Sequence, residues 1–239
     1  MIKALESSGR AMQVQLRRHE LIANNLANVT TTGFKKLFAQ VAQETAQPAA
    51  PGGAATRRLS VGSATSSVQG PLQSTGNPLD AALMGDGYFE VETPDGPRLS
   101  RDGAFSLGPN GELLHSSGNP VLADGSPVRI ETVGSILPDG TVLDGDRPVG
   151  RLSVVRPVAG SALLRRGDNL LEAPGGTEPV PEGETQVLAG RVEGSNVEAV
   201  EEMVDMIRAF RAYEMAQKAA QAADDTLRVA VERVGAVRA

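Results

Sequence analysis

The sequence predicts an α+β protein, in which a long helix at each end of the chain flanks a central antiparallel all-β domain. Two observations indicate this fold class. Apolar residues recur in steps of three and four near both ends of the chain, which is the spacing of one helix face. Between the ends, short apolar runs alternate with Asp-Gly and Asn-Gly pairs roughly 8–12 residues apart. We expect the two helices to pair with each other as a coiled-coil-like α domain.

The N-terminal part of the α domain is expected over residues 1–42, as a helix followed by a bend. Its apolar seam runs in alternating steps of four and three, as in a coiled coil, and consists of Leu5, Gly9, Met12, Leu16, His19, Ala23 and Leu26. Three consecutive threonines and Gly33 then interrupt the helix. Gly33 permits a bend, and Phe34 is expected to anchor the next amphipathic run by burying its ring.

The middle of the chain has two parts. Residues 43–70 are expected to form an extended arm or linker, because they are rich in Gln, Ala, Pro, Gly, Ser and Thr and offer little apolar surface to bury. The β domain is expected over residues 71–190, where pairs such as Asn110-Gly111 and Asp144-Gly145 supply the positive φ angles of tight turns. The pattern predicts an antiparallel sheet or barrel of short strands.

The segment 191–239 is expected to complete the α domain with a helix from about residue 195 to 236, on the order of 60 Å long at about 1.5 Å per residue. Ser195 and Glu198 have the spacing of a capping box at its start. One apolar stripe follows steps of three and four: Met203, Met206, Phe210, Tyr213, Gln217, Ala220, Asp224, Leu227, Val231 and Val234. A parallel stripe consists of Val200, Val204 and Ile207. Because a small β domain does not need so long a helix, the helices are expected to pair with each other, with other copies, or both.

Composition argues against several classes of function. A net charge of −6 argues against nucleic acid, because phosphate binding needs a basic face. The chain has no cysteine, so it has no disulfide framework, thiolate metal site or cysteine nucleophile. No segment reaches the roughly 20 apolar residues that span a bilayer, so we expect no membrane insertion. Glu6 and Arg10 interrupt any signal-peptide core, which by itself would suggest the cytoplasm.

Motifs for catalysis and metal binding do not stand out. His19 lies in a predicted helix and His115 near a turn, so no histidine pair is available for a metal. Nothing resembles a Ser-His-Asp order with a nucleophile elbow. The many carboxylates of residues 80–146 are interpreted as turn residues. We therefore expect no enzyme activity, no cofactor and no metal.

Residues 23–35 read Ala-Asn-Asn-Leu-Ala-Asn-Val-Thr-Thr-Thr-Gly-Phe-Lys. This segment resembles the N-terminal signature of flagellar basal-body rod and hook proteins, and it matches all the fixed positions of that signature. Segments within 75–105 and 193–214 resemble the same family, in the same order. Within the family, residues 75–80 and the short length are most similar to the proximal rod subunit that carries a β domain, with the distal rod subunit as the alternative.

The resemblance implies a structural subunit of the bacterial flagellar basal-body rod, which polymerises by helix–helix packing into the axial drive shaft. It also implies export through the flagellar type III apparatus without a cleaved signal peptide, and assembly in the periplasm. The expected partners are copies of the chain itself, neighbouring flagellar rod proteins and the export apparatus. Two alternatives stay open: an envelope binding module that oligomerises through its helices, and an envelope enzyme anchored by them.

Subunit-interface residues are expected in the signature and on the C-terminal stripes. Three asparagines within five residues are unusual in a helix, because the Asn side chain competes for the backbone. Their amides are expected to hydrogen-bond between chains and fix the register; the alternative is a fraying helix end before Thr30. The predicted interface residues are Asn24, Asn25, Leu26, Asn28, Gly33, Phe34, Val200, Met203, Val204, Ile207, Phe210 and Tyr213.

Overall fold

The computed structural model describes residues 2–46, 56–181 and 183–236. At the edges of these ranges it describes the backbone alone, for residues 2–5, 41–46, 56–61 and 230–236. The predicted seam positions Leu5, Val231 and Val234 therefore lie outside the described side chains.

The chain divides into two compact units. The helical unit contains residues 1–27, 37–63 and 198–239. The β unit contains residues 28–36 and 64–197. The segment 28–36, which follows the N-terminal helix directly, is thus part of the β unit.

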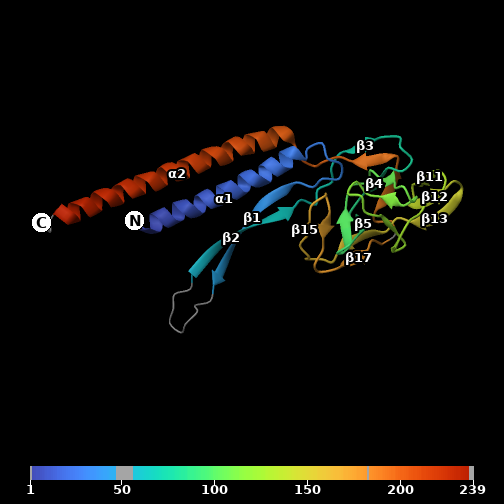
Figure 1. The fold of residues 1–239 in the computed structure, drawn as a ribbon, viewed down its shortest axis with the longest axis horizontal. Helices are drawn as coiled ribbons and strands as arrows, with labels where there is room; N and C mark the ends of the chain where they lie inside the picture. Colours follow the sequence, from blue (N-terminus) through green and yellow to red (C-terminus); the bar gives the residue numbers. More distant parts are fainter. Residues whose placement is uncertain (1, 47–55, 182, 237–239) are drawn as a thin grey trace. The chain divides into compact units, whose positions relative to one another are not determined.

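The helical unit is built from two helices and a two-stranded ribbon: α1 (Ile2–Ala27), α2 (Ala199–Ala236), β1 (Leu37–Ala46) and β2 (Thr56–Thr65). The two helices pack side by side (Figure 1). The prediction of a long helix near each end of the chain is confirmed. Neither helix, over its described residues, is long and apolar enough to cross a membrane.

Helix α1 ends at Ala27, shortly before the interruption that the sequence predicts at residues 30–33. The amphipathic run expected after this bend does not continue the α domain as helix, because residues 37–46 form strand β1. Two features explain the change. Gly33 takes a φ of +64°, which turns the chain. The Leu37 N–H donates to Asn25 Oδ1 at 2.8 Å, so this backbone is held in the extended form that pairs with β2. Part of the predicted arm over 43–70 is therefore a paired strand, and residues 47–55 lie outside the described residues.

Helix α2 begins without the predicted capping box. Its first helical bond runs from the Glu202 N–H to the Glu198 carbonyl oxygen at 3.0 Å. The Ser195 hydroxyl instead accepts a hydrogen bond from the Val197 N–H at 3.3 Å, two residues along the chain. Ser195 therefore closes a local turn before the helix, which is the competing use of a serine side chain at such positions.

Seventeen short strands make up the described part of the β unit, and all of their pairings are antiparallel. The strands are β3 (Leu72–Ser74), β4 (Ala81–Met84), β5 (Tyr88–Thr93), β6 (Gly96–Ser100), β7 (Ser106–Leu107), β8 (Leu113–Leu114), β9 (Leu122–Ala123), β10 (Ser126–Pro127), β11 (Gly134–Ile136), β12 (Thr141–Asp144), β13 (Arg147–Arg151), β14 (Val154–Pro157), β15 (Leu164–Arg165), β16 (Leu171–Glu172), β17 (Thr177–Pro179), β18 (Gln186–Ala189) and β19 (Arg191–Glu193). The largest sheet has the strand order β15-β16-β6-β5-β14-β17. A separate three-stranded sheet has the order β11-β12-β13. The predicted antiparallel β architecture is confirmed.

The core of the β unit lies on both sides of strand β5. Successive side chains of a strand point to opposite faces, and Tyr88 and Phe89 belong to two different apolar clusters. Phe89 meets Phe105 edge to face, with ring centroids 5.2 Å apart. Tyr88, Phe89 and Phe105 are all buried, so the expectation that these aromatic residues form core is confirmed.

One Asp-Gly pair does not make a hairpin turn. Gly111 and Gly145 have positive φ angles, as the predicted turns require. Gly103, which follows Asp102, does not have a positive φ angle. A Cβ placed on it would lie 1.6 Å from the Ala81 carbonyl oxygen. This glycine permits a close approach of two backbones, which leaves Asp102 buried inside the β unit.

Candidate functional site

An apolar stripe is exposed on helix α2. Its side chains are between 43% and 76% exposed and belong to Val200, Met203, Val204, Ile207 and Phe210. Their spacing of three and four residues places them along one face of the helix. Exposed apolar residues are normal singly, but a contiguous group of them marks an interaction surface. The stripe is therefore the first candidate site of the molecule.

The opposite face of α2 packs against α1. Glu202 and Ala209 are buried on this face, and Arg18 of α1 lies 3.9 Å from Asp205. Ala209 follows Ile207 by two residues, about 200° around the helix. The predicted seam therefore holds only in part: Met206 and Tyr213 are half-buried, but Met203 and Phe210 are exposed, while their neighbours Glu202 and Ala209 are buried.

The predicted seam of α1 also holds only in part. Met12 and His19 are half-buried, whereas Leu16 and Ala23 are exposed and Ile22 is buried in place of Ala23. Two other predicted interface residues, Leu26 on α1 and Tyr213 on α2, are half-buried.

Asn25 joins α1 to both β1 and α2. Its Nδ2 donates to the Leu37 carbonyl oxygen at 2.8 Å and to Glu202 Oε2 at 3.0 Å, and its Oδ1 accepts from the Leu37 N–H. The side chain is 1% exposed. The amide of Asn25 is therefore used inside the chain, and not between chains as expected for the asparagine cluster. Asn24 is exposed, and Asn28 accepts a hydrogen bond from the Thr31 hydroxyl at 3.2 Å.

Gly33 and Phe34 are fixed inside the β unit. The Gly33 N–H donates to the Glu193 carbonyl oxygen at 2.6 Å, and a Cβ on Gly33 would lie 2.1 Å from the Asp102 nitrogen. Phe34 is fully buried, with the Arg165 guanidinium 4.1 Å from the centre of its ring. The expected burial of Phe34 and the positive φ of Gly33 are confirmed.

A buried charge cluster follows Phe34. Lys35 Nζ lies 2.5 Å from Glu193 Oε1, and Arg101 Nη1 lies 3.2 Å from Glu193 Oε2. The Gly70 N–H also donates to Glu193 Oε1 at 2.8 Å. Burial lowers the pKa of Lys35, while the hydrogen bond to Glu193 opposes this shift. The sequence carries no local sign of this cluster: Lys35 lies in the signature of residues 23–35, but nothing near it identifies Glu193 or Arg101 as its partners.

A second polar cluster contains a serine, a histidine and an aspartate. Ser100 Oγ and Asp102 Oδ2 both lie on the Nε2 side of His115, at 2.9 and 3.8 Å. A hydrolytic triad needs the carboxylate at Nδ1, opposite the nucleophile, but His115 Nδ1 meets Ser117 Oγ at 2.9 Å. Ser100 is also fully buried. The arrangement is therefore structural.

The same cluster ties the segment 28–36 to the β strands. The Thr32 hydroxyl donates to Asp102 Oδ1 at 2.6 Å, and Ser116 donates to Asp102 Oδ2 at 2.5 Å. Burial lowers the pKa of His115, and the nearby carboxylates of Asp102 and Asp168 oppose this shift.

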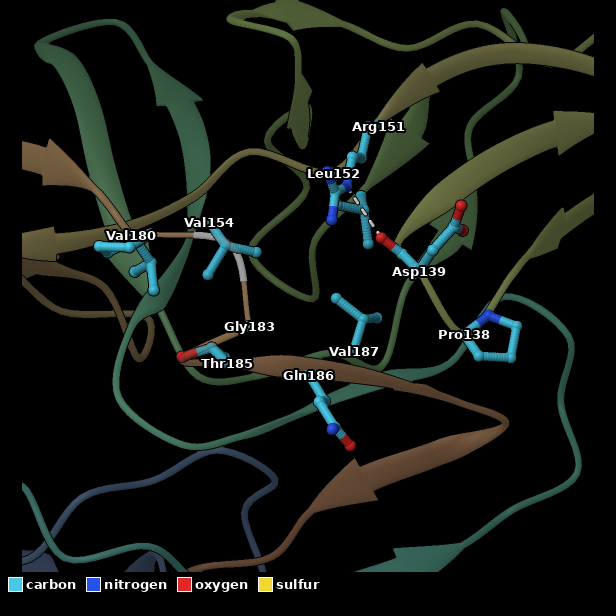
Figure 2. A pocket seen from close by; sticks show the side chains of 11 residues that line it. Pro138, Asp139, Arg151, Leu152, Val154, Val180, Gly183, Thr185, Gln186 and Val187 are labelled. Atoms are coloured by element: carbon cyan, nitrogen blue, oxygen red, sulfur yellow. Dashed lines mark hydrogen bonds between the residues drawn. The ribbon is translucent and has the colours of Figure 1, made fainter.

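A cavity of about 300 Å³ opens among the turns of the β unit (Figure 2). Leu152 and Val187 line it together with Arg151, whose Nε donates to the Asp139 carbonyl oxygen at 2.9 Å. Hydrogen bonds from Thr141 lower the pKa of Asp139. A general acid at neutral pH needs a raised carboxyl pKa, so Asp139 is not poised for that role. Within the described ranges, no group of three potential ligand side chains converges on a metal position.

Comparison with known proteins identifies three regions of the chain. "Flagella basal body rod protein" matches residues 5–35, "Flagellar hook protein FlgE/F/G D1 domain" matches 82–143, and "Flagellar basal body rod FlgEFG protein C-terminal" matches 188–233. These regions contain most of α1, residues 82–143 and the last strand of the β unit, and most of α2.

Similar proteins match along nearly the whole chain. The flagellar basal-body rod protein FlgF of Caulobacter vibrioides is 38% identical, over 96% of this chain and 97% of its own length. The flagellar basal-body rod protein FlgG of Agrobacterium fabrum is 34% identical, over 94% and 96%. The FlgF protein of Salmonella typhimurium is 33% identical, over 94% and 95%. With both helices and the β unit matched in order, the chain belongs to the flagellar basal-body rod protein family.

Proposed function

We propose that the chain is a structural subunit of the flagellar basal-body rod that polymerises by helix–helix packing into the axial drive shaft. The observation that carries the proposal is the exposed stripe of apolar side chains on α2. Most of the stripe lies on the face opposite to α1, and Phe210 lies at the edge of that face, beside Leu16 of α1. Burial of apolar surface on association is favourable by about 25 cal/mol per Å². The stripe thus supplies affinity for a neighbouring subunit.

The proposal includes coiled-coil-like pairing of α1 with α2. Six buried or half-buried residues of α1 follow steps of four and three: Ser8, Met12, Gln15, His19, Ile22 and Leu26. Leu21 and Asn25, which are also buried, lie beside this row. Those of α2 follow the same steps: Glu202, Met206, Ala209, Tyr213, Ala216 and Ala220. This is the heptad spacing of a coiled-coil seam, and it supports the pairing.

The partners in this proposal are other copies of the chain, neighbouring rod proteins and the type III export apparatus, which would carry the chain to the periplasm without a cleaved signal peptide. The proposed role involves no catalysis and no cofactor. For the subtype we infer the proximal rod subunit that carries a β domain, with the distal rod subunit as the alternative. This choice rests on residues 75–80 and on the length of 239 residues.

A carboxylate on the stripe tests the proposal. Ile207→Asp or Phe210→Asp is expected to block rod assembly and motility, because the charge would lose its water in the subunit contact. Both side chains are exposed in the single chain, so its free energy of unfolding should change by less than about 0.5 kcal/mol. Complementation of a strain lacking the gene, with swimming as the readout, measures assembly, and urea unfolding measures stability.

The matched control is Ala219→Asp, which places the same charge at an exposed position of α2 on a different face. This variant should assemble normally. Normal motility of Ile207→Asp would contradict the proposal. Loss of motility in all three variants would mean that added charge, and not the stripe, is responsible.

A further inference from the structure

The chain crosses between its two units at several points, and the β-unit ends of these crossings lie in three short segments. The β unit contains residues 28–36 and 64–197, so the chain enters or leaves it at both ends of each range. The four ends lie in the segments 28–36, 64–70 and 193–197. The covalent path between the helical unit and the β unit therefore runs through these three segments.

Glu193 connects all three segments. Its backbone carbonyl oxygen accepts a hydrogen bond from the Gly33 N–H at 2.6 Å. Its side-chain Oε1 accepts from Lys35 Nζ at 2.5 Å and from the Gly70 N–H at 2.8 Å. Because Glu193 is fully buried, its carboxylate depends on these donors. Moving any one segment away from the other two would leave a buried polar group without its partner.

Asn196 connects the same segments a second time. Its Oδ1 accepts from the Lys36 N–H at 2.6 Å, and its Nδ2 donates to the Val68 carbonyl oxygen at 2.7 Å. Lys35 Nζ donates to the same Val68 oxygen at 2.8 Å. The Ser66 N–H donates to the Lys36 carbonyl oxygen at 2.8 Å. Each segment is thus hydrogen-bonded to both of the others.

Close backbone packing supports these hydrogen bonds. A Cβ placed on Gly70 would lie 2.1 Å from the Gly194 carbonyl oxygen, so this position accepts only glycine without a shift of the backbone. The Gly194 N–H donates to the Pro71 carbonyl oxygen at 2.8 Å. The segments 64–70 and 193–197 therefore lie directly against each other.

We propose that the three segments 28–36, 64–70 and 193–197 form a clasp that opens and closes as one unit, and that keeps the β-unit ends of the crossings together under mechanical load. The inference rests on the proposed role in a drive shaft. Its physical reason is that Glu193 and Asn196 each bind both other segments, so one segment cannot leave without breaking hydrogen bonds of all three. A load on one crossing is therefore shared by the whole clasp.

Hydrogen exchange of the full chain tests the cooperative opening. The amides of Gly33, Lys36 and Gly70 bond across the clasp. They should share one opening free energy and one dependence on urea. The amides of Leu113 and Val121, in the apolar core of the β unit, should open only at a higher free energy. Different opening free energies among the clasp amides, or a value equal to that of the core amides, would overturn the inference.

Asn196→Ala separates cooperative opening from a local loss. The variant removes the acceptor of the Lys36 N–H, but it leaves Glu193, the acceptor of the Gly33 and Gly70 N–H groups, in place. If the clasp opens as one unit, exchange at all three amides should accelerate about tenfold. Acceleration that is confined to Lys36 would contradict the clasp.

Asn119→Ala is the matched control. It removes a hydrogen bond from Asn119 Nδ2 to Ser117 Oγ, which lies in the β unit but outside the clasp. Exchange at the clasp amides should stay unchanged in this variant. An acceleration equal to that of Asn196→Ala would mean that any loss in the β unit opens the three segments, and the inference would be wrong.

Swimming at two viscosities tests the role under load. Asn196 lies outside the α2 stripe, so cells with Asn196→Ala should assemble rods and swim normally in dilute medium. In medium thickened with an inert polymer the drag is higher, and these cells should lose more speed than cells with the unmodified chain or with Asn119→Ala. Equal speeds in both media would overturn the role under load, and so would a loss of swimming in dilute medium.

The result for Asn196→Ala is separate from the test of the proposed function. Ile207→Asp, on the stripe, is expected to abolish swimming in dilute medium already, because rods do not assemble. A clasp variant without any effect would leave that expectation unchanged. Normal swimming of Ile207→Asp would instead contradict the proposed function and leave the hydrogen-exchange result for the clasp intact.

Discussion

The β unit and the helical unit treat apolar surface in opposite ways. In the β unit, Phe89, Leu113 and Val142 are fully buried within the chain's own strands. In the helical unit, the only α2 side chains buried among those described are Glu202 and Ala209, and large apolar residues are exposed. One region therefore completes its core alone, whereas the other leaves apolar surface for a partner.

The two units do not differ in how they treat buried polar groups. Glu193 in the β unit accepts from Lys35, Arg101 and a backbone N–H. Each unit nevertheless has one buried polar atom that no described residue satisfies, Arg101 Nε in the β unit and Gln15 Oε1 in the helical unit. The comparison between the units therefore rests on their apolar surface.

Among the variants that test this comparison, Glu193→Ala in the β unit is expected to cause the largest loss in the free energy of unfolding. The variant leaves the cations of Lys35 and Arg101 buried without their anion, and breaking a buried ion pair in this way costs about 3–5 kcal/mol. Urea unfolding of the β unit measures the loss. Glu112→Ala, which removes a pair to the exposed Arg129, is the control and should cost less than about 1 kcal/mol. Equal losses in the two variants would mean that the buried cluster does not stabilise the β unit.

Gly33→Ala is expected to have the next largest effect. Its φ is positive and its Cβ would lie 2.1 Å from the Asp102 backbone nitrogen, so a loss of more than about 2 kcal/mol is expected. Gly118→Ala is a matched control, because Gly118 has a φ of +80° and open space around its Cβ position. It should lose only about 1 kcal/mol. If both variants unfolded alike, the close approach at Gly33 would have no role.

Asn25→Ala tests the hydrogen bonds by which Asn25 links α1 to β1 and α2 within the helical unit. The variant removes the partner of the Leu37 N–H and carbonyl oxygen and one donor to Glu202, so a loss of about 2 kcal/mol is expected. Gln13→Ala, at an exposed position of α1, is the control and should change the free energy of unfolding by less than about 0.5 kcal/mol. Thermal melting followed by helix circular dichroism gives both values. A neutral Asn25→Ala would contradict the role of the amide within the chain.

The smallest expected effect is the dependence of the free energy of unfolding on pH. Burial lowers the pKa of His115 in the folded chain, so the unfolded chain binds a proton first as pH falls through about 6.5. The contribution of His115 to the free energy of unfolding should therefore fall below that pH, by at most about 1.4 kcal/mol per pH unit, and stay level above it. Urea unfolding at pH 7.5 and pH 5.5 measures this slope. His115→Gln should flatten it, and an identical slope in the variant would exclude His115 as its source.

Local patterns predicted the elements that depend on local spacing. Both helices and the antiparallel strands followed from apolar periodicity and turn pairs, and the stripe residues Val200, Val204 and Ile207 stood out before any contact was known. Strand β1 was not predictable in this way, because the extended backbone at Leu37 depends on its partner strand β2 and on the hydrogen bond to Asn25. The predicted helix cap at Ser195 was wrong because its hydroxyl accepts a hydrogen bond from the nearer Val197 N–H.

The buried polar clusters could not be predicted from the sequence. Lys35 meets Glu193 across 158 positions, and Asn25 meets Glu202 across 177. No local pattern encodes such pairs, because each depends on how distant backbone segments pack. The signature marked Asn25, Gly33 and Lys35 as a group, but their roles inside the chain emerge only from the fold.

The sequence by itself determined that both terminal segments are helices and that α2 has apolar residues over more than one face, because helical spacing is set by backbone geometry. The tertiary structure decided which face is used inside the chain. Ala209 and Glu202 face α1, while Met203 and Ile207 face away from it. The choice depends on packing: a small alanine lets two helices approach closely, and Asn25 of α1 supplies the hydrogen bond that a buried Glu202 needs.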